Sequence, residues 1–271
     1  ALSLLMAPLE SAYGRGDRPD AQPSGNDFVN VRLAIEKTAI ARTGITNLAV
    51  IFDISPGWHL YWRNPGDSGL PPRVTFTPID GVTFGEPQWP APKRLVEGET
   101  LVDYVYEREL VLIIPVTLDA KYTGGDSLPL AARLDWLVCR ERCLQGTQNI
   151  RMSFPIADTA KASKDATRFE AARARRPQPV KDDDQVTVRW NGLDLSIRAI
   201  GATSVAFFPY ENDEYVYPAD MVRNGAARSD TLRLPYDKDV ASLKRVAGVL
   251  AITRKGVETF VEISMTPAKS K

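Results

Sequence analysis

The sequence predicts an all-β protein made of two β-sandwich domains joined by a short helix and a linker. Three observations lead to this prediction. Short apolar or alternating segments recur along most of the chain, each bounded by Pro, Gly, Asp or Asn. The 20 prolines and 18 glycines suit many turns better than long helices. Near Ile156 the strand pattern gives way to an Ala-rich stretch and then resumes.

Residues 1–27 are expected to be a leader and linker outside the fold. Residues 1–9 (ALSLLMAPL) are apolar but short, with no basic residue before them, and fit the tail of an export signal. Residues 13–26 are rich in Gly, Pro and Asp, which predicts disorder. The segment therefore favours an exported protein.

The first domain is predicted over residues 28–156. Val29–Ile35 alternates apolar and polar residues, and residues 48–54 form a buried type of run that ends at Ser55-Pro56-Gly57. Further strands are expected at 59–63, 73–77, 110–118, 128–138 and 148–154. Short strands with no helical period between them indicate an antiparallel sandwich. The absence of crossover helices argues against a parallel α/β fold.

A helical linker is predicted over residues 157–184. Residues 157–176 are rich in Ala, Lys, Arg and Glu, with Phe169 the only large apolar residue, so a solvated helix is expected before Pro177. A Pro- and Asp-containing stretch follows, up to Asp184. A second, smaller β-sandwich domain is predicted over residues 185–268, with strands at 186–190, 194–200, 205–210, 231–234, 249–253 and 259–264. It contains no Cys and no His.

Charge and composition exclude several classes of function. The chain has 34 Lys and Arg against 34 Asp and Glu, whereas a nucleic-acid surface needs a basic excess. No apolar run approaches the length of a membrane helix. Gly66-Asp67-Ser68-Gly69 resembles the nucleophile segment of chymotrypsin-like serine proteases, which take their histidine base from a distant segment of the chain. The only histidine here, His59, lies nine residues before Ser68, so these residues are predicted to form a turn-rich loop instead. Two Cys and one His also argue against zinc.

The cysteine pair is the most informative feature. Three residues separate Cys139 from Cys143, a spacing that suits a tight turn between antiparallel strands and brings the sulfurs within bonding distance. As a staple, a five-residue loop contributes only about 2 kcal/mol, against about 4.7 kcal/mol for a hundred residues. In a redox pair, Arg140 and Arg142 would favour the thiolate. Copper(I) also accepts two thiolates. The spacing alone leaves all three readings open.

Two motifs in separate parts of the sequence favour the interpretation of the cysteines as a redox pair. Residues 57–69 (GWHLYWRNPGDSG) and 135–143 (DWLVCRERC) resemble the periplasmic N-terminal domain of the thiol:disulfide interchange protein DsbD family, closest to its ScsB-type (copper-sensitivity suppressor) branch. The resemblance covers roughly residues 27–155. The second β domain, with Phe207-Phe208-Pro209-Tyr210, also fits that longer branch.

The resemblance implies an immunoglobulin-like first domain in the periplasm that acts as a thiol-disulfide oxidoreductase without a metal or other cofactor. It implies a thioredoxin-like donor domain, thioredoxin-fold partner proteins and a membrane domain of the same system. Cys139 and Cys143 match the family's redox pair, with Cys143 as the cysteine that bonds the partner. A cap loop over the pair would correspond to residues 97–106, and its residues would be Leu101, Val102, Asp103, Tyr104 and Tyr106.

The neighbouring residues carry two readings each. Tyr61, Trp62 and Trp136 either flank the disulfide, as aromatic residues do in that family, or belong to the sandwich core. His59 either tunes the pKa of a nearby thiolate or is simply hydrogen-bonded within its strand. The alternative function is a non-catalytic β-sandwich adaptor or a copper(I)-binding protein, in which the cysteines are a staple or soft-metal ligands.

Overall fold

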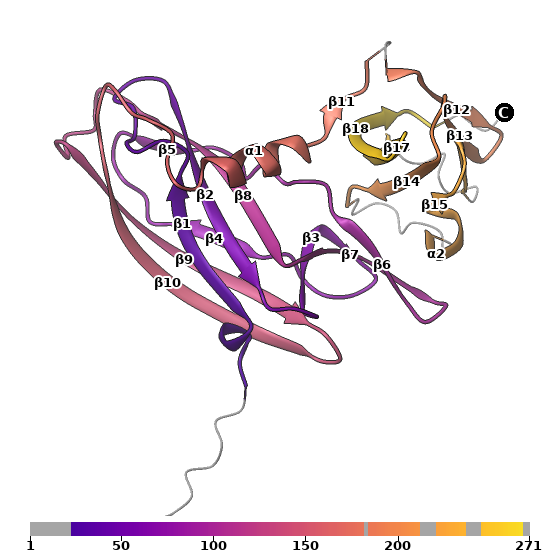
Figure 1. Ribbon diagram of the computed structural model, residues 1–271, viewed down its shortest axis with the longest axis horizontal. Coiled ribbons are helices and arrows are strands. Elements are labelled where there is room, and N and C mark those ends of the chain that lie inside the picture. Colours follow the sequence, from indigo (N-terminus) through magenta and orange to yellow (C-terminus); the bar gives the residue numbers. More distant parts are fainter. Residues whose placement is uncertain (1–22, 182–183, 212–220, 237–244, 268–271) are drawn as a thin grey trace, which may run out of the picture.

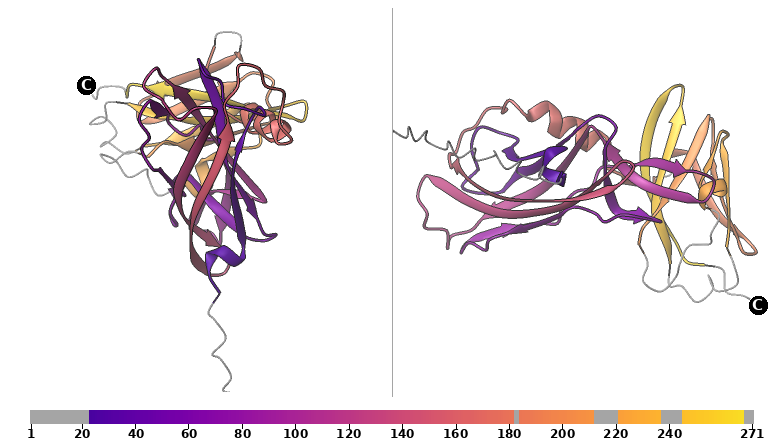
Figure 2. Two further views of the ribbon diagram at one scale, coloured as in Figure 1. Left: turned by 90° about the vertical axis from the view of Figure 1, so that its left-hand side faces the viewer. Right: turned by 90° about the horizontal axis from the view of Figure 1, so that it is seen from below.

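A computed structural model describes residues 23–181, 184–211, 221–236 and 245–267 (Figure 1). The strands form two pairs of sheets, one built from β1 to β10 and the other from β11 to β18. Figures 1 and 2 show the second pair at one end of the first. No helix in the described ranges has the length and apolar character needed to cross a membrane.

The first pair of sheets is an immunoglobulin-like β-sandwich. Its four-stranded sheet has the order β1 (Val29–Ile35), β2 (Ile45–Ile54), β8 (Glu109–Leu118) and β5 (Val82–Phe84). Its six-stranded sheet has the order β10 (Cys143–Pro155), β9 (Ser127–Cys139), β3 (His59–Gly66), β7 (Leu101–Glu107) and β6 (Lys93–Glu97), with β4 (Arg73–Phe76) also paired to β9. All pairs are antiparallel, as predicted.

The two sheets bury alternate residues against each other. Leu33 of β1, Phe52 of β2, Leu112 of β8 and Trp136 of β9 belong to one buried cluster between them. Every strand predicted before Ile156 is present, and β1 has the predicted bounds. β5, β6 and β7 were not predicted as strands. Residues 97–106, expected to form a loop, instead include the end of β6 and most of β7.

The end of the predicted leader is ordered, which corrects the expectation for residues 24–27. Gly25–Asp27 is a short 3-10 helix with a capping box between Ser24 and Asp27. The Asn26 amide donates to the Thr147 carbonyl at 2.8 Å and accepts from the Thr147 N–H at 2.9 Å. These bonds attach the segment to β10. The polar, turn-forming residues 24–27 therefore form a turn that is bound to the sandwich. The predicted export signal lies outside the described residues.

Helix α1 (Ala166–Ala174) is shorter than the predicted helix and is not a solvated connection. Phe169 is fully buried and, with Ala172, packs on the outer face of the four-stranded sheet, against Ile51, Val111 and Ile113. Figure 1 shows α1 lying across β2 and β8. One Phe and small Ala residues are enough to dock this face, because the Ala side chains let the helix approach the sheet closely.

The second pair of sheets contains every strand predicted after residue 184. The five-stranded sheet has the order β11 (Gln178–Pro179), β18 (Val257–Met265), β17 (Val246–Arg254), β14 (Ser204–Pro209) and β15 (Ala226–Ala227). The three-stranded sheet has the order β12 (Val186–Asn191), β13 (Asp194–Ala199) and β16 (Thr231–Pro235), and α2 is Met221–Asn224. β11 lies inside the predicted linker and pairs in parallel with β18.

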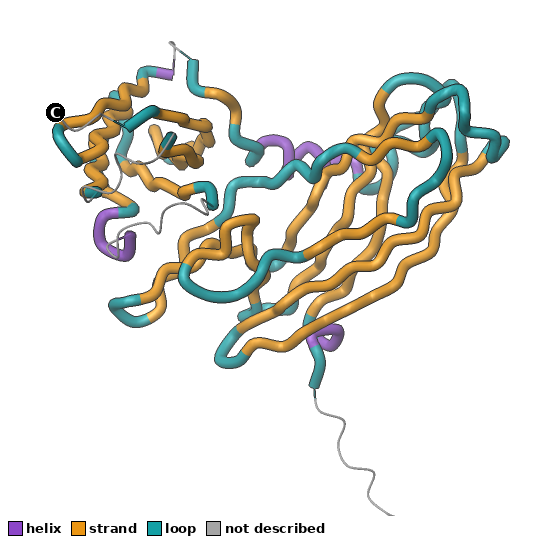
Figure 3. The backbone as a smooth tube through the Cα atoms, turned by 180° about the vertical axis from the view of Figure 1, so that it is seen from behind, coloured by secondary structure: helices purple, strands orange, loops and turns teal. Residues whose placement is uncertain are grey.

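Direct contacts join the two pairs of sheets. The Trp62 ring lies 6.3 Å from that of Phe208 and 5.7 Å from that of Tyr210, and Tyr104 lies 5.4 Å from Phe208. The Arg94 guanidinium donates to the Met221 carbonyl at 2.6 Å, so the hairpin of β6 and β7 reaches α2 (Figures 1 and 3). We refer to this set of contacts as the aromatic interface. The division into two domains at residues 157–184 stays a prediction.

Candidate active site

Cys139 and Cys143 form a disulfide at the turn between β9 and β10. They are direct cross-strand partners with a Cα–Cα distance of 4.1 Å and an S–S bond of 1.99 Å. The Arg140 N–H donates to the Arg142 carbonyl at 3.2 Å and closes the turn. The predicted tight turn between antiparallel strands is therefore confirmed.

The disulfide lies on the outer face of the six-stranded sheet. Successive side chains of a strand point to opposite faces, so Leu137 and Cys139 face outward where Trp136 and Val138 face the core. His59 is the cross-strand partner of Cys139 and shares its face. A small buried cluster forms there, separate from the main core, from Cys139, Tyr61 and Val105, with Leu95 and Leu137 packed against it.

The two sulfur-bearing residues differ in exposure. Cys139 is only 3% exposed, because β9 has β3 on one side and β10 on the other. Cys143 is exposed, because β10 is the edge strand of its sheet. A reagent or protein approaching from solvent therefore meets Cys143 first.

The Tyr61 hydroxyl is the polar centre of the site. Its oxygen lies 3.9 Å from the Cys143 Sγ, 3.3 Å from the His59 Nε2 and 3.4 Å from the Ser68 Oγ. Burial raises the pKa of Tyr61, so its hydroxyl stays protonated at neutral pH. Burial also lowers the pKa of His59, against the opposing effect of the nearby carboxylates, so the imidazole is neutral at pH 7.

Residues 66–69, which we call the Ser68 loop, cover the Tyr61 ring. The buried Asp103 carboxylate accepts the Ser68 N–H at 2.9 Å and the Ser68 hydroxyl at 2.6 Å. The Asp67 carboxylate accepts the Val102 N–H at 2.7 Å. Gly69 lies so close to the ring that a Cβ would be 2.1 Å from the Tyr61 Cζ, and its φ of 77° also favours glycine.

The Ser68 loop is the part of the site that the sequence argument missed. The sequence predicts a turn-rich loop at Gly66-Asp67-Ser68-Gly69 and includes it in the family motif, but it assigns these residues no role beside the disulfide; in the structure Gly66 ends β3 and the loop follows it. The available signal was its position, since it directly follows the strand that carries His59 and Tyr61. Its contact with Asp103 depends on the pairing of β3 with β7, which the sequence pattern did not reveal.

Several predicted neighbours of the disulfide lie on the other face of their strands. Trp62 and Tyr104 belong to the aromatic interface, and their ring centroids lie 6.2 Å apart. The Trp136 indole donates to the Gly25 carbonyl at 3.3 Å from within the core. The Tyr106 hydroxyl donates to the Pro90 carbonyl at 2.5 Å. Strand alternation explains all four corrections, because each residue is one position away from a residue that faces the site.

The predicted cap is also corrected. Residues 97–106 form the tip of the β6–β7 hairpin and most of β7, where Leu101 is 42% exposed and Val102 is buried in the core. Of the predicted cap residues, Asp103 bonds to the Ser68 loop through its side chain and Val102 through its backbone. Arg140 and Arg142 are exposed in the turn, and Arg140 lies 3.9 Å from Glu141.

The described residues contain no group of three or more His, Cys, Asp or Glu that could hold a metal ion.

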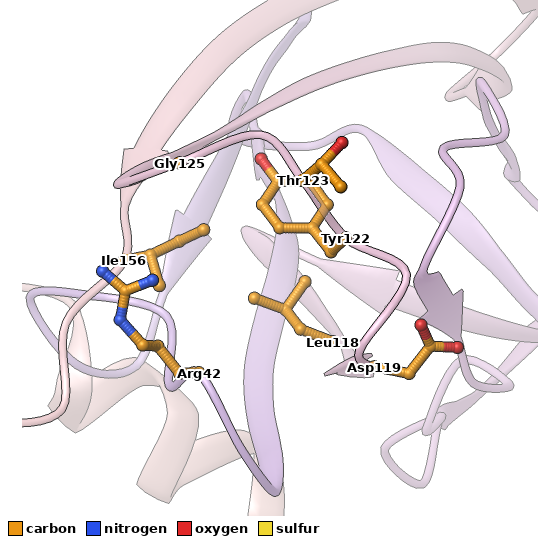
Figure 4. Close-up of a pocket in the computed structure, with 7 residues that line it drawn as sticks. All are labelled: Arg42, Leu118, Asp119, Tyr122, Thr123, Gly125 and Ile156. Carbon is orange, nitrogen blue, oxygen red and sulfur yellow. The ribbon is translucent and has the colours of Figure 1, made fainter.

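A separate cavity of about 310 Å³ is lined by Arg42, Leu118, Asp119, Tyr122, Thr123, Gly125 and Ile156 (Figure 4). Ile156 directly follows β10, whose first residue is Cys143. The cavity therefore lies at the opposite end of the β9–β10 hairpin from the disulfide and takes no part in the site.

Comparison with known proteins gives a consistent family. Residues 26–155 match the family model described as thiol:disulfide interchange protein DsbD, N-terminal. The N-terminal periplasmic domain of ScsB from Proteus mirabilis is 18% identical, with 93% of this chain and 97% of that chain covered and a TM-score of 0.59. This likeness extends over both pairs of sheets and concerns the fold. No curated protein sequence matches the chain.

Two structures from Neisseria meningitidis each match about half of the chain. The DsbD N-terminal domain in the reduced form is 17% identical, covering 52% of this chain and 92% of that chain, with a TM-score of 0.29. A complex between the DsbD N-terminal and PilB N-terminal domains is 14% identical, covering 45% and 80%, with a TM-score of 0.26. The matched residues 26–155, just under half of the chain, include the whole first sandwich and its disulfide, and this part of the chain is similar to the N-terminal domain of the thiol:disulfide interchange protein DsbD.

Proposed function

We propose that this chain relays reducing equivalents in the periplasm, from a thioredoxin-like donor to thioredoxin-fold partner proteins, through Cys139 and Cys143. The family match over residues 26–155 and the disulfide within it support a thiol-disulfide exchange domain. One observation carries the finer proposal: the two sulfurs share a tight turn, but one is exposed and the other is buried. This asymmetry suits a pair that reacts with another protein and then closes on itself.

The exposed sulfur has the role of partner-bonding atom in both half-reactions. Reduction of the chain begins with the closed disulfide. A donor thiolate attacks the Cys143 Sγ, the S–S bond breaks and Cys139 leaves as a thiolate. The donor's second thiolate then attacks the donor's first sulfur, which is bonded to Cys143 in the mixed disulfide, and releases Cys143 as a thiolate. Two electrons have passed from the donor, which now holds the disulfide.

The reverse sequence reduces the partner. The Cys143 thiolate attacks the partner's disulfide, forms the mixed disulfide and displaces the partner's other cysteine as a thiolate. Cys139, directly opposite Cys143, then attacks the Cys143 Sγ and releases the second partner thiolate. Its burial supports this resolving role, because a buried thiolate meets its neighbouring sulfur before it meets an external disulfide.

Trapping the mixed disulfide tests the proposal. The Cys139→Ser variant lacks the resolving thiol, so its Cys143 should accumulate a covalent adduct with an oxidised thioredoxin-fold protein. The adduct is read on non-reducing gels and located by mass spectrometry. Cys143→Ser is the matched control and should give no adduct, because its remaining thiol is buried.

The same experiment separates the proposal from a structural staple. A relay pair in the wild-type chain should open on addition of reduced thioredoxin without loss of the near-ultraviolet circular dichroism of the fold. A disulfide that stays closed until denaturant is added, together with no adduct from Cys139→Ser, would show that the pair is structural.

A further inference from the structure

The Tyr61 hydroxyl has more possible hydrogen-bond partners than it has protons. Ser68 Oγ, His59 Nε2 and Cys143 Sγ all lie within hydrogen-bond reach of its oxygen. The hydroxyl has one proton to donate, so it can serve one of these acceptors at a time. The choice among them depends on which neighbour is the strongest acceptor.

Ser68 can only accept from Tyr61. Its own hydroxyl proton is donated to the Asp103 carboxylate at 2.6 Å, a charge-assisted bond. Asp103 is 2% exposed and also accepts the Ser68 N–H, so two bonds to one carboxylate fix the serine in place. Ser68 is therefore a held acceptor above the Tyr61 oxygen.

We propose that the Tyr61 hydroxyl is a hydrogen-bond donor that stabilises the Cys143 thiolate, and that Ser68, held by Asp103, accepts this proton while the disulfide is closed. The inference rests on the proposed exchange function and assigns chemistry to that site. In the closed disulfide, the Cys143 sulfur is neutral and a weak acceptor, so Ser68 competes well. When the donor's second thiolate releases Cys143 from the mixed disulfide, the Cys143 sulfur becomes an anion and draws the O–H toward itself.

His59 completes the arrangement. Its Nε2–H tautomer donates to the phenol oxygen, which leaves the Tyr61 proton for Ser68 or for sulfur. Burial keeps the imidazole neutral at pH 7, so it acts as a hydrogen-bond donor without adding a charge. Tyr61 touches the reacting sulfur and is the catalytic residue, whereas Ser68, Asp103 and His59 are positioning residues.

The other charged and titratable groups around the pair come from every neighbouring element. The turn itself carries Arg140, Glu141 and Arg142. β7 contributes Asp103 and Glu107, which face His59 together with Glu97 of β6, and Lys93 of β6 is paired with Glu107 at 2.8 Å. Because these charges stay in place when only the Tyr61 hydroxyl is removed, Tyr61→Phe isolates the donor.

The test measures the pH midpoint for alkylation of Cys143. All variants carry Cys139→Ser, which leaves Cys143 as the single thiol of the chain. The rate of reaction with iodoacetamide is followed by mass spectrometry from pH 5.5 to 10. Its midpoint reports the thiolate equilibrium, and its plateau at high pH reports access to the sulfur.

Tyr61→Phe should raise the midpoint by about one pH unit, a roughly tenfold loss of thiolate at neutral pH, because a charge-assisted bond is lost. Ser68→Ala should shift it in the opposite direction, because the resting acceptor no longer competes for the proton. In the Tyr61→Phe background, Ser68→Ala should have no effect on the midpoint. Tyr106→Phe removes a buried hydroxyl from the core face and should leave the midpoint unchanged.

The outcomes separate this inference from the proposed function. An unchanged midpoint in a folded Tyr61→Phe variant, or equal shifts from Tyr61→Phe and Tyr106→Phe, would overturn the role of Tyr61. A Ser68→Ala shift that persists without the Tyr61 hydroxyl would overturn the role of Ser68. The mixed-disulfide assay with an oxidised thioredoxin-fold protein tests exchange itself, and its success would leave the proposed function standing in either case.

Discussion

Two cysteines that face each other across a hairpin have opposite environments because of the strands beside them. Cys139 ends a strand paired on both sides, whereas Cys143 begins an edge strand. The spacing in the sequence predicts the hairpin and the bond. It does not predict which sulfur is covered, since that depends on β3, which lies some 80 residues earlier in the chain. The partner-bonding role proposed for Cys143 comes from the family resemblance and not from the spacing of the cysteines.

Selective alkylation follows from this asymmetry. In the reduced wild-type protein, a limiting amount of iodoacetamide should modify Cys143 over Cys139 by about tenfold or more, because only an accessible thiolate reacts quickly. Peptide mass spectrometry gives the ratio. In denaturant the preference should disappear. Equal labelling of both cysteines under native conditions would contradict the exposure difference.

At the scale of elements, the sequence predicts strands better than the faces that they present. Apolar runs bounded by turn residues located every strand except the short or partly polar ones, β5, β6, β7, β11 and β15. β6 and β7 were missed because charged residues, among them the buried Asp103, interrupt the apolar pattern of residues 93–107. Helix α1 was placed correctly but taken as solvated, since a single Phe does not give a helical apolar stripe.

The docking of α1 should be sensitive to acid. Arg32 holds the Asp165 carboxylate at 2.7 Å and lowers its pKa from the ordinary 3.8. A lowered pKa in the folded state gives stability that is present above pH 3.8 and is lost as pH falls below it. At pH 7, the free energy of unfolding of Asp165→Asn should therefore be about 1 to 3 kcal/mol lower than that of the wild type. Urea titration measures this difference, and the variant should unfold at the lower urea concentration.

The same comparison at pH values below 3.8 provides the control, because progressive protonation of Asp165 should make the difference in stability between the two proteins smaller. Glu170→Ala, an exposed change on the same helix, should match the wild type at pH 7. A gap between Asp165→Asn and the wild type that is equally large at both pH values would rule out the ion pair as its cause.

At the scale of the whole molecule, the two pairs of sheets are joined by more than the linker. Asn64 donates to the Pro209 carbonyl at 2.8 Å and accepts the Gly66 N–H at 3.1 Å, so it ties the base of the Ser68 loop to the second pair. The Arg63 guanidinium lies 4.6 Å from the centre of the Tyr210 ring. Burial and a neighbouring Glu262 raise the pKa of Tyr210 to about 12, so it remains neutral there.

Cleavage of the connection should therefore not separate the two halves. A protease site inserted between Thr159 and Ala160, which precede α1, should yield two fragments that still elute together on gel filtration. The docked helix and the aromatic interface hold them in place. Elution as two separate folded fragments would show that these contacts are too weak to join them. In that case the predicted two-domain division would describe independent units.

β3 serves the active site with one face and the aromatic interface with the other. His59 and Tyr61 point outward, and Leu60 and Trp62 point inward. Loss or gain of a single residue between the start of this strand and Tyr61 would exchange the two sets, because side chains alternate strictly along it. The catalytic phenol would enter the core, and the indole would be left in water. In descendants of this gene, β3 should accept substitutions but keep its length.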